Sequence, residues 1–484
     1  MPRSTKTKRS AARASRRASG KAFFRAMNSA RTRAVMAPEQ PATAASEFRG
    51  FAIHKSDGPK GRVAVAAQHF QTGDVVLREV AWIVGSWEEG AGGVDASTLS
   101  PEYWPGVTAD EFEAGENALA DIDGVDELDK ARCLLECCAR WRAGKTAYAP
   151  IKRLTASNVP LCAAAVAAMR ADADVSLLVP AEMPDVLLVH TLGALNANSH
   201  TLEDLGGCGV FPMAAMMEHS CQPNCTFATE GSTLTVHATE RIDAGEPLSI
   251  DYGNAPMDPA ADRQAALKAG YGFDCACDKC TGVDQCRAFQ CPACSGRVCP
   301  RYAGAWQCLD CGRLVDKHEK RRFEDDENAV KRMTAPTVIE AVDLVVAAGT
   351  LHKGHYLVYR MLDALARGGA ARVATMAPGE ARQVVLHWAR VLETLELQVT
   401  GYHHEKMLAY DMMAQCAVAA GERRVAQSAW GHAFSQARVC VGRRARMTRN
   451  FFALSMAPPA TVGELAARLG QGAERVAEAL RDEA

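Results

Sequence analysis

The 484-residue sequence lacks any long uninterrupted apolar run. Its Ala-rich pieces, such as residues 161–169, fall short of the ~18 residues that a membrane-spanning helix needs, so we expect no integral membrane segment. Hydrophobic residues make up 48% and charged residues 23% of the chain, which is typical of a globular protein. At ~150 residues per domain, the length predicts roughly three structural units.

Acidic residues are absent from the first 38 positions, which hold 11 Lys and Arg and leave 44 basic against 57 acidic residues in the rest. A segment rich in Arg, Ser and Ala without acids is typical of an organelle transit peptide, a nuclear-import signal or a nucleic-acid-binding arm. Composition leaves these alternatives open. We interpret residues 1–45 as a basic, disordered or targeting tail, and as the one part through which nucleic acid is a candidate partner.

No secretory signal is visible, although the chain has 18 cysteines. Nine of them lie between Cys275 and Cys311, several at C-x-x-C spacing. Thiols clustered in this way, without a secretory signal, indicate zinc in a reducing compartment rather than disulfides. We therefore expect an intracellular protein, in the nucleus, the cytoplasm or an organelle.

Three of these cysteines, Cys275, Cys277 and Cys280, form the pattern C-x-C-x-x-C. Their spacing suits one tetrahedral cation, which needs a fourth ligand from elsewhere. Cys286 lies nearby and Cys221 lies far upstream, and the spacing alone leaves both open.

Four further cysteines form two knuckles, C-P-A-C and C-L-D-C, with 13 residues between them. This spacing is typical of a small zinc ribbon, so we expect a second zinc site. Its ligands would be Cys291, Cys294, Cys308 and Cys311. Four thiolates leave no open coordination position, so the ribbon would stabilise its segment and would not catalyse.

Hydrophobic periodicity organises the first half of the chain. Residues 48–87 alternate apolar and polar positions and predict short strands, whereas 108–195 show helical spacing and predict a helical insert. Strands return over 206–253, with a hairpin predicted over 226–237 around the turn residues Glu230, Gly231 and Ser232.

In the second half, the charged run at 316–328 is interpreted as a boundary, followed by helices over 330–484. Within these, residues 405–442 predict two helices around A-A-G-E-R-R, with small residues where the helices would touch. This resembles one tetratricopeptide (TPR) hairpin, and a plain helical packing domain is the alternative.

One string is more specific than these patterns. Residues 218–225 read E-H-S-C-Q-P-N-C, and E-P-L-S-I-D-Y and Y-G-F-D-C-A-C-D-K-C follow in order. Together with residues 58–79, they resemble the core of SET-domain protein-lysine methyltransferases of the SMYD kind. The resemblance spans roughly 48–450 with gaps.

The resemblance implies an α+β fold. A β-rich SET domain over 46–255 is split by the helical insert, a zinc-bound post-SET and zinc-ribbon segment covers 256–315, and an all-α, TPR-like C-terminal domain covers 330–484.

The activity implied is transfer of a methyl group from S-adenosylmethionine to the side-chain amine of a lysine in a histone or non-histone protein. Tyr252 matches the family's catalytic tyrosine, which orients the amine, and Cys221 matches the fourth ligand of the post-SET zinc. The same matching gives the cofactor-binding residues as Lys60, Gly61, Arg62, Asn196, Glu218, His219, Tyr271 and Phe273.

The sequence departs from the family in three places. Glu218 replaces an asparagine, and a carboxylate can only accept hydrogen bonds and would repel the carboxylate of the cofactor. Val63 replaces a glycine of the first loop, and the MYND zinc finger is missing because residues 88–132 contain no cysteine. We expect an enzyme with weakened cofactor binding; the alternative is an inactive SET-fold scaffold for protein interactions.

Overall fold

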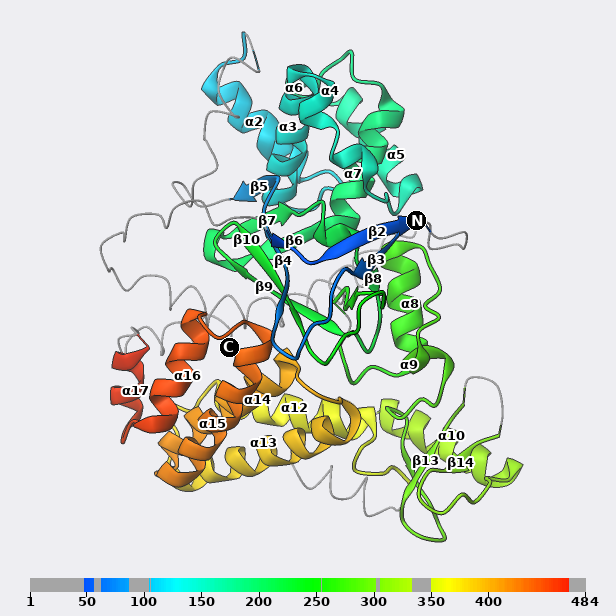
Figure 1. Cartoon of the computed structure of the whole chain (residues 1–484), viewed down its shortest axis with the longest axis vertical. Coiled ribbons are helices and arrows are strands. Elements are labelled where there is room, and N and C mark those ends of the chain that lie inside the picture. Colours follow the sequence, from blue (N-terminus) through cyan, green and yellow to red (C-terminus); the bar gives the residue numbers. More distant parts are fainter. Residues whose placement is uncertain are drawn as a thin grey trace, which may run out of the picture.

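The computed structural model describes residues 48–55, 62–86, 104, 106–253, 255–301, 305–332 and 350–469. The basic tail and two predicted cofactor residues, Lys60 and Gly61, lie outside these ranges. A β-rich centre has the helical insert on one side and the C-terminal helices on the other, with a smaller cysteine-rich segment beside them (Figure 1). No helix in the described ranges combines the length and the apolar character that crossing a bilayer would need.

The β-rich centre consists of four small sheets. The largest is antiparallel with the order β1-β4-β10-β9; the others are β5-β7-β6, the β2-β3 pair, and the parallel pair of β8 with β11. The strands are β1 (Phe48–Arg49), β2 (Phe51–Lys55), β3 (Arg62–Ala66), β4 (Val75–Val80), β5 (Ile83–Ser86), β6 (Ser199–Leu202), β7 (Gly207–Val210), β8 (Glu218–His219), β9 (Cys225–Glu230), β10 (Thr233–Ala238) and β11 (Ser249–Ile250).

The hairpin predicted over 226–237 is confirmed, since β9 and β10 pair antiparallel through the turn at Gly231. The alternation of apolar residues explains its burial: Leu234 and Val236 are fully buried on one face of β10.

The helical insert is confirmed between β5 and β6. Both strands pair with β7, so the chain leaves and re-enters one sheet around the insert. The first helix begins with a capping box, in which Thr108 and Glu111 satisfy each other's backbone N–H groups. The helices are α2 (Ala109–Ala120), α3 (Leu128–Ala143), α4 (Lys145–Tyr148), α5 (Val159–Ala171), α6 (Ala173–Leu178) and α7 (Asp185–Asn198).

The cysteine-rich segment combines short helices with a three-stranded sheet of order β12-β13-β14. Its elements are α8 (Ala260–Tyr271), α9 (Asp278–Thr281), β12 (Phe289–Gln290), β13 (Arg297–Cys299) and β14 (Gln307–Cys308), followed by α10 (Lys317–Arg332).

The charged run at 316–328, interpreted from the sequence as a boundary, forms helix α10. Its charges are arranged for a helix: Lys320 lies 3.9 Å from Glu324, one turn on. Its buried face carries Phe323, which stacks on Phe289 of the ribbon at 5.1 Å between ring centroids. Tertiary packing therefore continues through the run.

The C-terminal region is helical, as predicted, and the helical hairpin over 405–442 is confirmed. Helices α14 and α15 are joined by a short turn at Gly421, whose φ of 73° is left-handed. Ala409 and Ala429 are both only 3% exposed, as expected where helices pack closely. The helices are α12 (Tyr356–Ala370), α13 (Pro378–Gln398), α14 (His404–Ala419), α15 (Arg423–Cys440), α16 (Arg446–Met456) and α17 (Val462–Arg468).

Candidate functional site

His219 and Tyr252 meet because β8 and β11 lie side by side. The parallel pairing sets Ile250 opposite His219, and Tyr252 follows two residues later. The backbone N–H of Tyr252 donates to Nδ1 of His219 at 3.2 Å, and the two ring centroids are 5.1 Å apart. A short parallel pair thus joins two predicted site residues that are 33 positions apart in the chain.

Tyr271 and Phe273 complete an aromatic cluster around this pair. Tyr271 is the last residue of α8, and its ring centroid lies 5.0 Å from that of Tyr252. Its hydroxyl donates to the backbone carbonyl of Tyr252 at 2.9 Å. The ring of Phe273 lies 6.0 Å from that of His219. The structure therefore brings four of the predicted site residues together.

The hydroxyl of Tyr252 is fixed by the backbone. It donates to the carbonyl oxygen of Met217 at 2.6 Å. Burial raises the pKa of this phenol well above its ordinary value, and the neighbouring Tyr271 and Glu218 raise it further. The phenol is therefore protonated at neutral pH. The hydroxyl proton is used in the hydrogen bond to the carbonyl oxygen of Met217. The lone pairs of the hydroxyl oxygen remain available to accept a hydrogen bond.

His219 is neutral in this environment. Burial lowers its pKa to about 4, and its side chain is only 1% exposed. Because Nδ1 accepts from the backbone of Tyr252, the ring proton belongs on Nε2, which lies 3.2 Å from Sγ of Cys221. The histidine therefore connects the aromatic cluster to the cysteines.

A cavity of about 420 Å³ opens beside Tyr252 and Tyr271, between the β-rich centre and the C-terminal helices. His219 and Phe273 do not line it, although the ring centroid of His219 lies 5.1 Å and that of Phe273 6.5 Å from that of Tyr252. Its lining residues are Ala197, Asn198, Ser199, His200, Thr201, Glu203, Ala214, Ala215, Phe227, Ala228, Thr229, Ile250, Asp251, Tyr252, Gly253, Tyr271, His404, Met407, Val441 and Met447.

The first cysteine cluster contains Cys221 together with the C-x-C-x-x-C motif. The Sγ atoms of Cys221, Cys275, Cys277 and Cys280 all lie within 4.8 Å of one another, and those of Cys221 and Cys280 are 3.5 Å apart. Tetrahedral zinc with bonds of ~2.3 Å sets sulfurs ~3.8 Å apart, so this set fits zinc. Cys286 lies outside the cluster, with its thiol directed at the carbonyl of Pro256.

The second cluster consists of Cys291, Cys294, Cys308 and Cys311, again within 4.8 Å of one another. The Sγ atoms of Cys294 and Cys308 are 3.6 Å apart, and those of Cys291 and Cys311 are 3.9 Å apart. The set fits zinc with no position left for a substrate. Cys294 and Cys311 are exposed, whereas three of the four cysteines in the first cluster are buried.

Some predicted cofactor residues lie apart from this site. The side chain of Asn196 donates to the carbonyl of Gly124 inside the helical insert, at 2.9 Å. Arg62 donates to the backbone carbonyl of Arg153. Glu218, by contrast, lies next to the site: it is half-buried and directly precedes His219.

Sequence reasoning missed residues that line the cavity. Asn198 lies two positions beyond Asn196 in the same string, so only the register separates them. His404 and Met407 reach the cavity from α14, and His404 Nε2 lies 3.2 Å from the carbonyl of Phe227 on β9. No local signal marks them, because their role depends on how the helices pack against the sheet.

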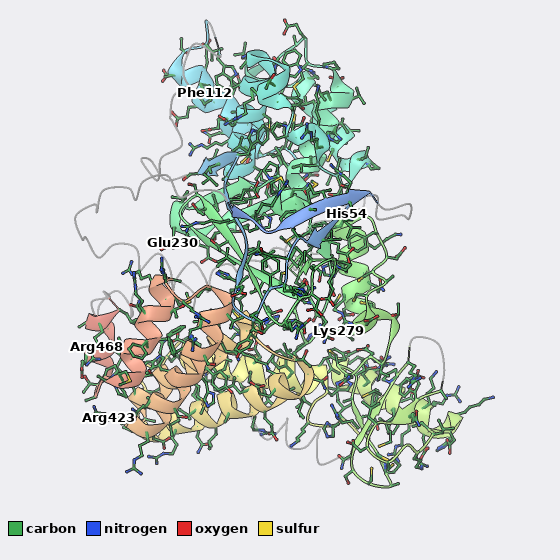
Figure 2. All side chains as sticks on the ribbon, in the orientation of Figure 1. His54, Phe112, Glu230, Lys279, Arg423 and Arg468 are labelled. Atoms are coloured by element: carbon green, nitrogen blue, oxygen red, sulfur yellow. The ribbon has the colours of Figure 1, made fainter. Side chains whose placement is uncertain are left out.

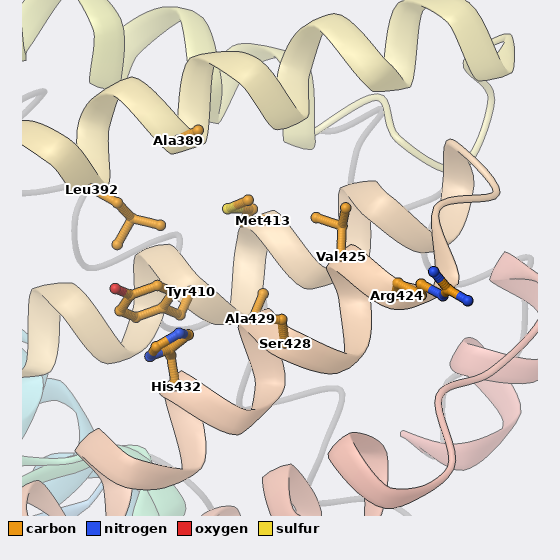
Figure 3. Close-up of a pocket in the computed structure, with 9 residues that line it drawn as sticks. All are labelled: Ala389, Leu392, Tyr410, Met413, Arg424, Val425, Ser428, Ala429 and His432. Atoms are coloured by element: carbon orange, nitrogen blue, oxygen red, sulfur yellow. The ribbon is translucent and has the colours of Figure 1, made fainter.

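A second cavity of about 440 Å³ lies between α13, α14 and α15 (Figure 3). Tyr410 and His432 stack at one end and Arg424 lies at the other. It contains none of the predicted site residues, and is lined by Ala389, Leu392, Tyr410, Met413, Arg424, Val425, Ser428, Ala429 and His432.

Comparison with known proteins matches residues 61–253 to the SET domain. N-lysine methyltransferase SMYD2 of Sus scrofa is 35% identical over 112 residues, 22% of this chain and 26% of that protein. Protein-lysine N-methyltransferase SMYD4 of Pongo abelii is 26% identical over 210 residues, 39% of this chain and 25% of that protein. The chain thus spans about a quarter of the length of these relatives.

Among solved structures, that of Rubisco LSMT bound to AdoMet aligns with 88% of this chain and 96% of its own chain. The sequence identity is 14% and the TM-score is 0.28.

Proposed function

We propose that this chain, a SMYD-like protein whose residues 61–253 are a SET domain, is an S-adenosylmethionine-dependent protein-lysine N-methyltransferase. The observation that carries the proposal is the hydroxyl of Tyr252, held by Met217 beside a cavity between the SET domain and the C-terminal helices. The activity named for its relatives SMYD2 and SMYD4 also supports it.

The cavity and the neighbouring aromatic cluster suggest how the reactants meet. The substrate lysine would enter through the cavity, and the methyl donor would lie next to His219 and Phe273. S-adenosylmethionine, when bound, supplies a methyl group already activated by its sulfonium. The chain then has to orient the amine and exclude water.

Tyr252 is suited to orient the amine. Its proton is committed to Met217, so its oxygen can accept an N–H from a neutral lysine. That hydrogen bond would fix the nitrogen lone pair toward the donor. Apolar walls such as Phe227, Ile250 and Met407 disfavour the charged ammonium beside them, whereas the carboxylates of Glu203 and Asp251, which line the same cavity, favour it.

Zinc at the first cysteine cluster would hold this arrangement together. The cluster ties Cys221, two residues after His219, to the segment that begins directly after Phe273. The four thiolates would hold the metal in a closed site, and the metal itself would supply a structural crosslink.

The test is incubation of the zinc-loaded protein with methyl-labelled S-adenosylmethionine and a whole-cell extract. We expect label on lysine side chains, with Tyr252→Phe lowering the rate by roughly a hundredfold because the amine loses its orientation. Tyr410→Phe removes a hydroxyl from the other cavity and should leave the rate unchanged. Label that persists undiminished in Tyr252→Phe would remove this tyrosine from the mechanism.

An interaction scaffold is the second candidate, favoured by Glu218 at the position where the family has asparagine. It predicts no heat of S-adenosylmethionine binding in calorimetry of the folded, zinc-loaded protein. Measurable binding together with lysine labelling would exclude it.

We keep several finer proposals that depend on sequence alone. The substrate lysine lies in a histone or non-histone protein. The protein works in a reducing, intracellular compartment. Residues 1–45 either bind nucleic acid or direct transport of the protein. Salt-dependent binding to DNA or RNA that disappears on deletion of 1–38 would support the nucleic-acid role. The division into 46–255, 256–315 and 330–484 also remains a proposal, which limited proteolysis would test.

A further inference from the structure

Arg263 is a buried cation without an obvious counter-ion. It lies on α8, is only 1% exposed, and is among the largest fully buried side chains. Burial of an unpaired charge costs several kcal/mol, so a buried guanidinium normally faces a carboxylate. In the described part of the chain, none of its hydrogen-bond partners is a carboxylate.

The partners of Arg263 are backbone carbonyls and sulfur atoms. Nη2 donates to the carbonyl of Lys279 at 3.0 Å and lies 3.6 Å from Sγ of Cys280. Nη1 donates to the carbonyl of Asp258 and lies 4.0 Å from Sγ of Cys286. Lys279, which belongs to α9, is labelled in Figure 2 and shows where this region lies, near one end of α8. The guanidinium thus faces the first cysteine cluster.

A nearby carboxylate, Asp284, interacts with this charge but is not among the hydrogen-bond partners of Arg263. It is itself buried: burial raises its pKa, whereas the positive charges of both Arg263 and Arg287 lower it. One of its oxygens already accepts the backbone N–H of Ala260 at the start of α8.

A zinc–thiolate centre in the first cluster would place negative charge beside Arg263. One Zn²⁺ with four thiolates has a net charge of −2. Groups that hydrogen-bond to metal ligands orient them and tune the affinity of the site, and their loss typically costs 10–100-fold in metal affinity. A guanidinium is well suited because its donors form a fixed planar fork.

We propose that Arg263 is the counter-ion and positioning residue of the first zinc centre. Its guanidinium offsets part of the negative charge of the centre and fixes the thiolate of Cys280. Because Arg263 and Tyr271 belong to the same helix, the contact also sets the position of α8 against the aromatic cluster. The inference depends on zinc in this cluster and not on methyl transfer.

The experiment follows zinc release from the full-length protein to a coloured chelator, with alkylation of freed cysteines mapped by mass spectrometry. In Arg263→Met we expect zinc to leave the first cluster at least tenfold faster, with early alkylation of Cys275, Cys277 and Cys280. The second cluster is the internal control, and its release rate should stay unchanged. Unchanged release from the first cluster would overturn the proposal, as would equal acceleration at both.

Two further variants separate charge from general destabilisation. Arg263→Lys keeps the charge but lacks the planar fork, so its release rate should lie between those of the original protein and Arg263→Met. A rate equal to that of Arg263→Met would mean that charge is irrelevant. Arg360→Met removes an arginine that pairs with Asp258 and contacts no sulfur, and should leave zinc release unchanged. Zinc kinetics are read without S-adenosylmethionine, so the outcome is independent of the proposed methyltransferase activity.

Discussion

At the scale of single residues, Glu218 is the position where this chain differs most from the pattern it resembles. The structure places it on β8, directly before His219 and close enough to Tyr252 to raise the pKa of the phenol. A carboxylate here adds negative charge near Tyr252, where we propose that the reactants meet. The donor carries a carboxylate of its own, so the two would repel.

We therefore predict that Glu218→Asn tightens S-adenosylmethionine binding by about tenfold, equivalent to ~1.4 kcal/mol. Isothermal calorimetry measures this directly. Glu230→Gln, which removes an exposed carboxylate at the tip of the β9-β10 hairpin, serves as the control and should leave the affinity unchanged. An unchanged or weaker affinity in Glu218→Asn would count against repulsion as the handicap.

At the scale of elements, two glycines allow close backbone contacts around β5: Gly85 lets the helical insert approach it, and Gly207 lets β7 approach it. A Cβ at Gly85 of β5 would lie 1.9 Å from the backbone oxygen of Asp129 in α3. A Cβ at Gly207 of β7 would lie equally close to the carbonyl oxygen of Gly85. Backbone oxygens cannot move aside without shifting the helix or the strand, so these contacts exclude any side chain.

The corresponding prediction is that Gly85→Ala lowers the free energy of unfolding by about 3 kcal/mol, because α3 and β5 are forced apart. Urea denaturation monitored by circular dichroism would measure it. Gly368→Ala in α12 is the matched control: nothing lies within 4 Å of its Cβ, so alanine should be neutral or stabilise by up to about 1 kcal/mol. Equal effects of the two changes would refute the contact argument.

The packing of α15 and its neighbours on the sheet also buries a titratable group. His237 of β10 is 4% exposed, and burial, with a contribution from His404, lowers its pKa to about 4. The unfolded chain binds this proton near pH 6.5 and the folded chain does not. The free energy of unfolding should therefore fall as the pH drops from 6.5 toward 4.

His237→Leu should reduce this dependence. Between pH 7.5 and 5.5 the variant is expected to lose about 1 kcal/mol less stability than the original protein, as measured by urea denaturation at both pH values. His54→Leu, at an exposed position on β2, should leave the pH dependence as it was. A variant whose stability declines as steeply as that of the original protein would show that His237 is protonated in the folded state.

At the scale of the whole molecule, the two cysteine clusters are small and local, whereas the described residues form three large hydrophobic cores. One core lies in the insert, one in the β-rich centre, and one spans the C-terminal helices and the ribbon. The first cluster forms only a small separate group with Leu267. Zinc should thus be needed for the site and not for the molecule as a whole.

Removal of zinc by a strong chelator under reducing conditions should raise hydrogen exchange over residues 271–311 and abolish S-adenosylmethionine binding. Exchange in α14 and α15 should stay as it was, because the core they share consists mostly of apolar residues of the C-terminal helices and includes just two metal ligands, Cys291 and Cys308. Mass spectrometry of deuterium uptake resolves the two regions. Loss of protection throughout the chain, or in neither region, would contradict this division.

The sequence by itself determined the features that depend on spacing. The hairpin over 226–237, the helical pair over 405–442 and the two knuckles of the ribbon each need only neighbours in the chain, so periodicity and turn residues predict them. The SET core was predicted differently, from the resemblance of the ordered string around Glu218 to Cys225 to a known family. The charged run at 316–328 forms α10, whose buried face packs on Phe289 outside the run, so spacing within the run does not predict this contact.

Only the tertiary structure decided which distant residues meet. Cys221, and not Cys286, belongs to the first cluster because it follows β8, which pairs with β11 next to the cysteine-rich segment. No spacing rule in the sequence relates Cys221 to Cys275. Packing between elements likewise places His404 and Met407 in the wall of the cavity. It also brings Arg263 close to Cys280. The local conformational preferences of the residues determine which helices and strands form. Burial of the apolar faces of these helices and strands determines which of them pack together.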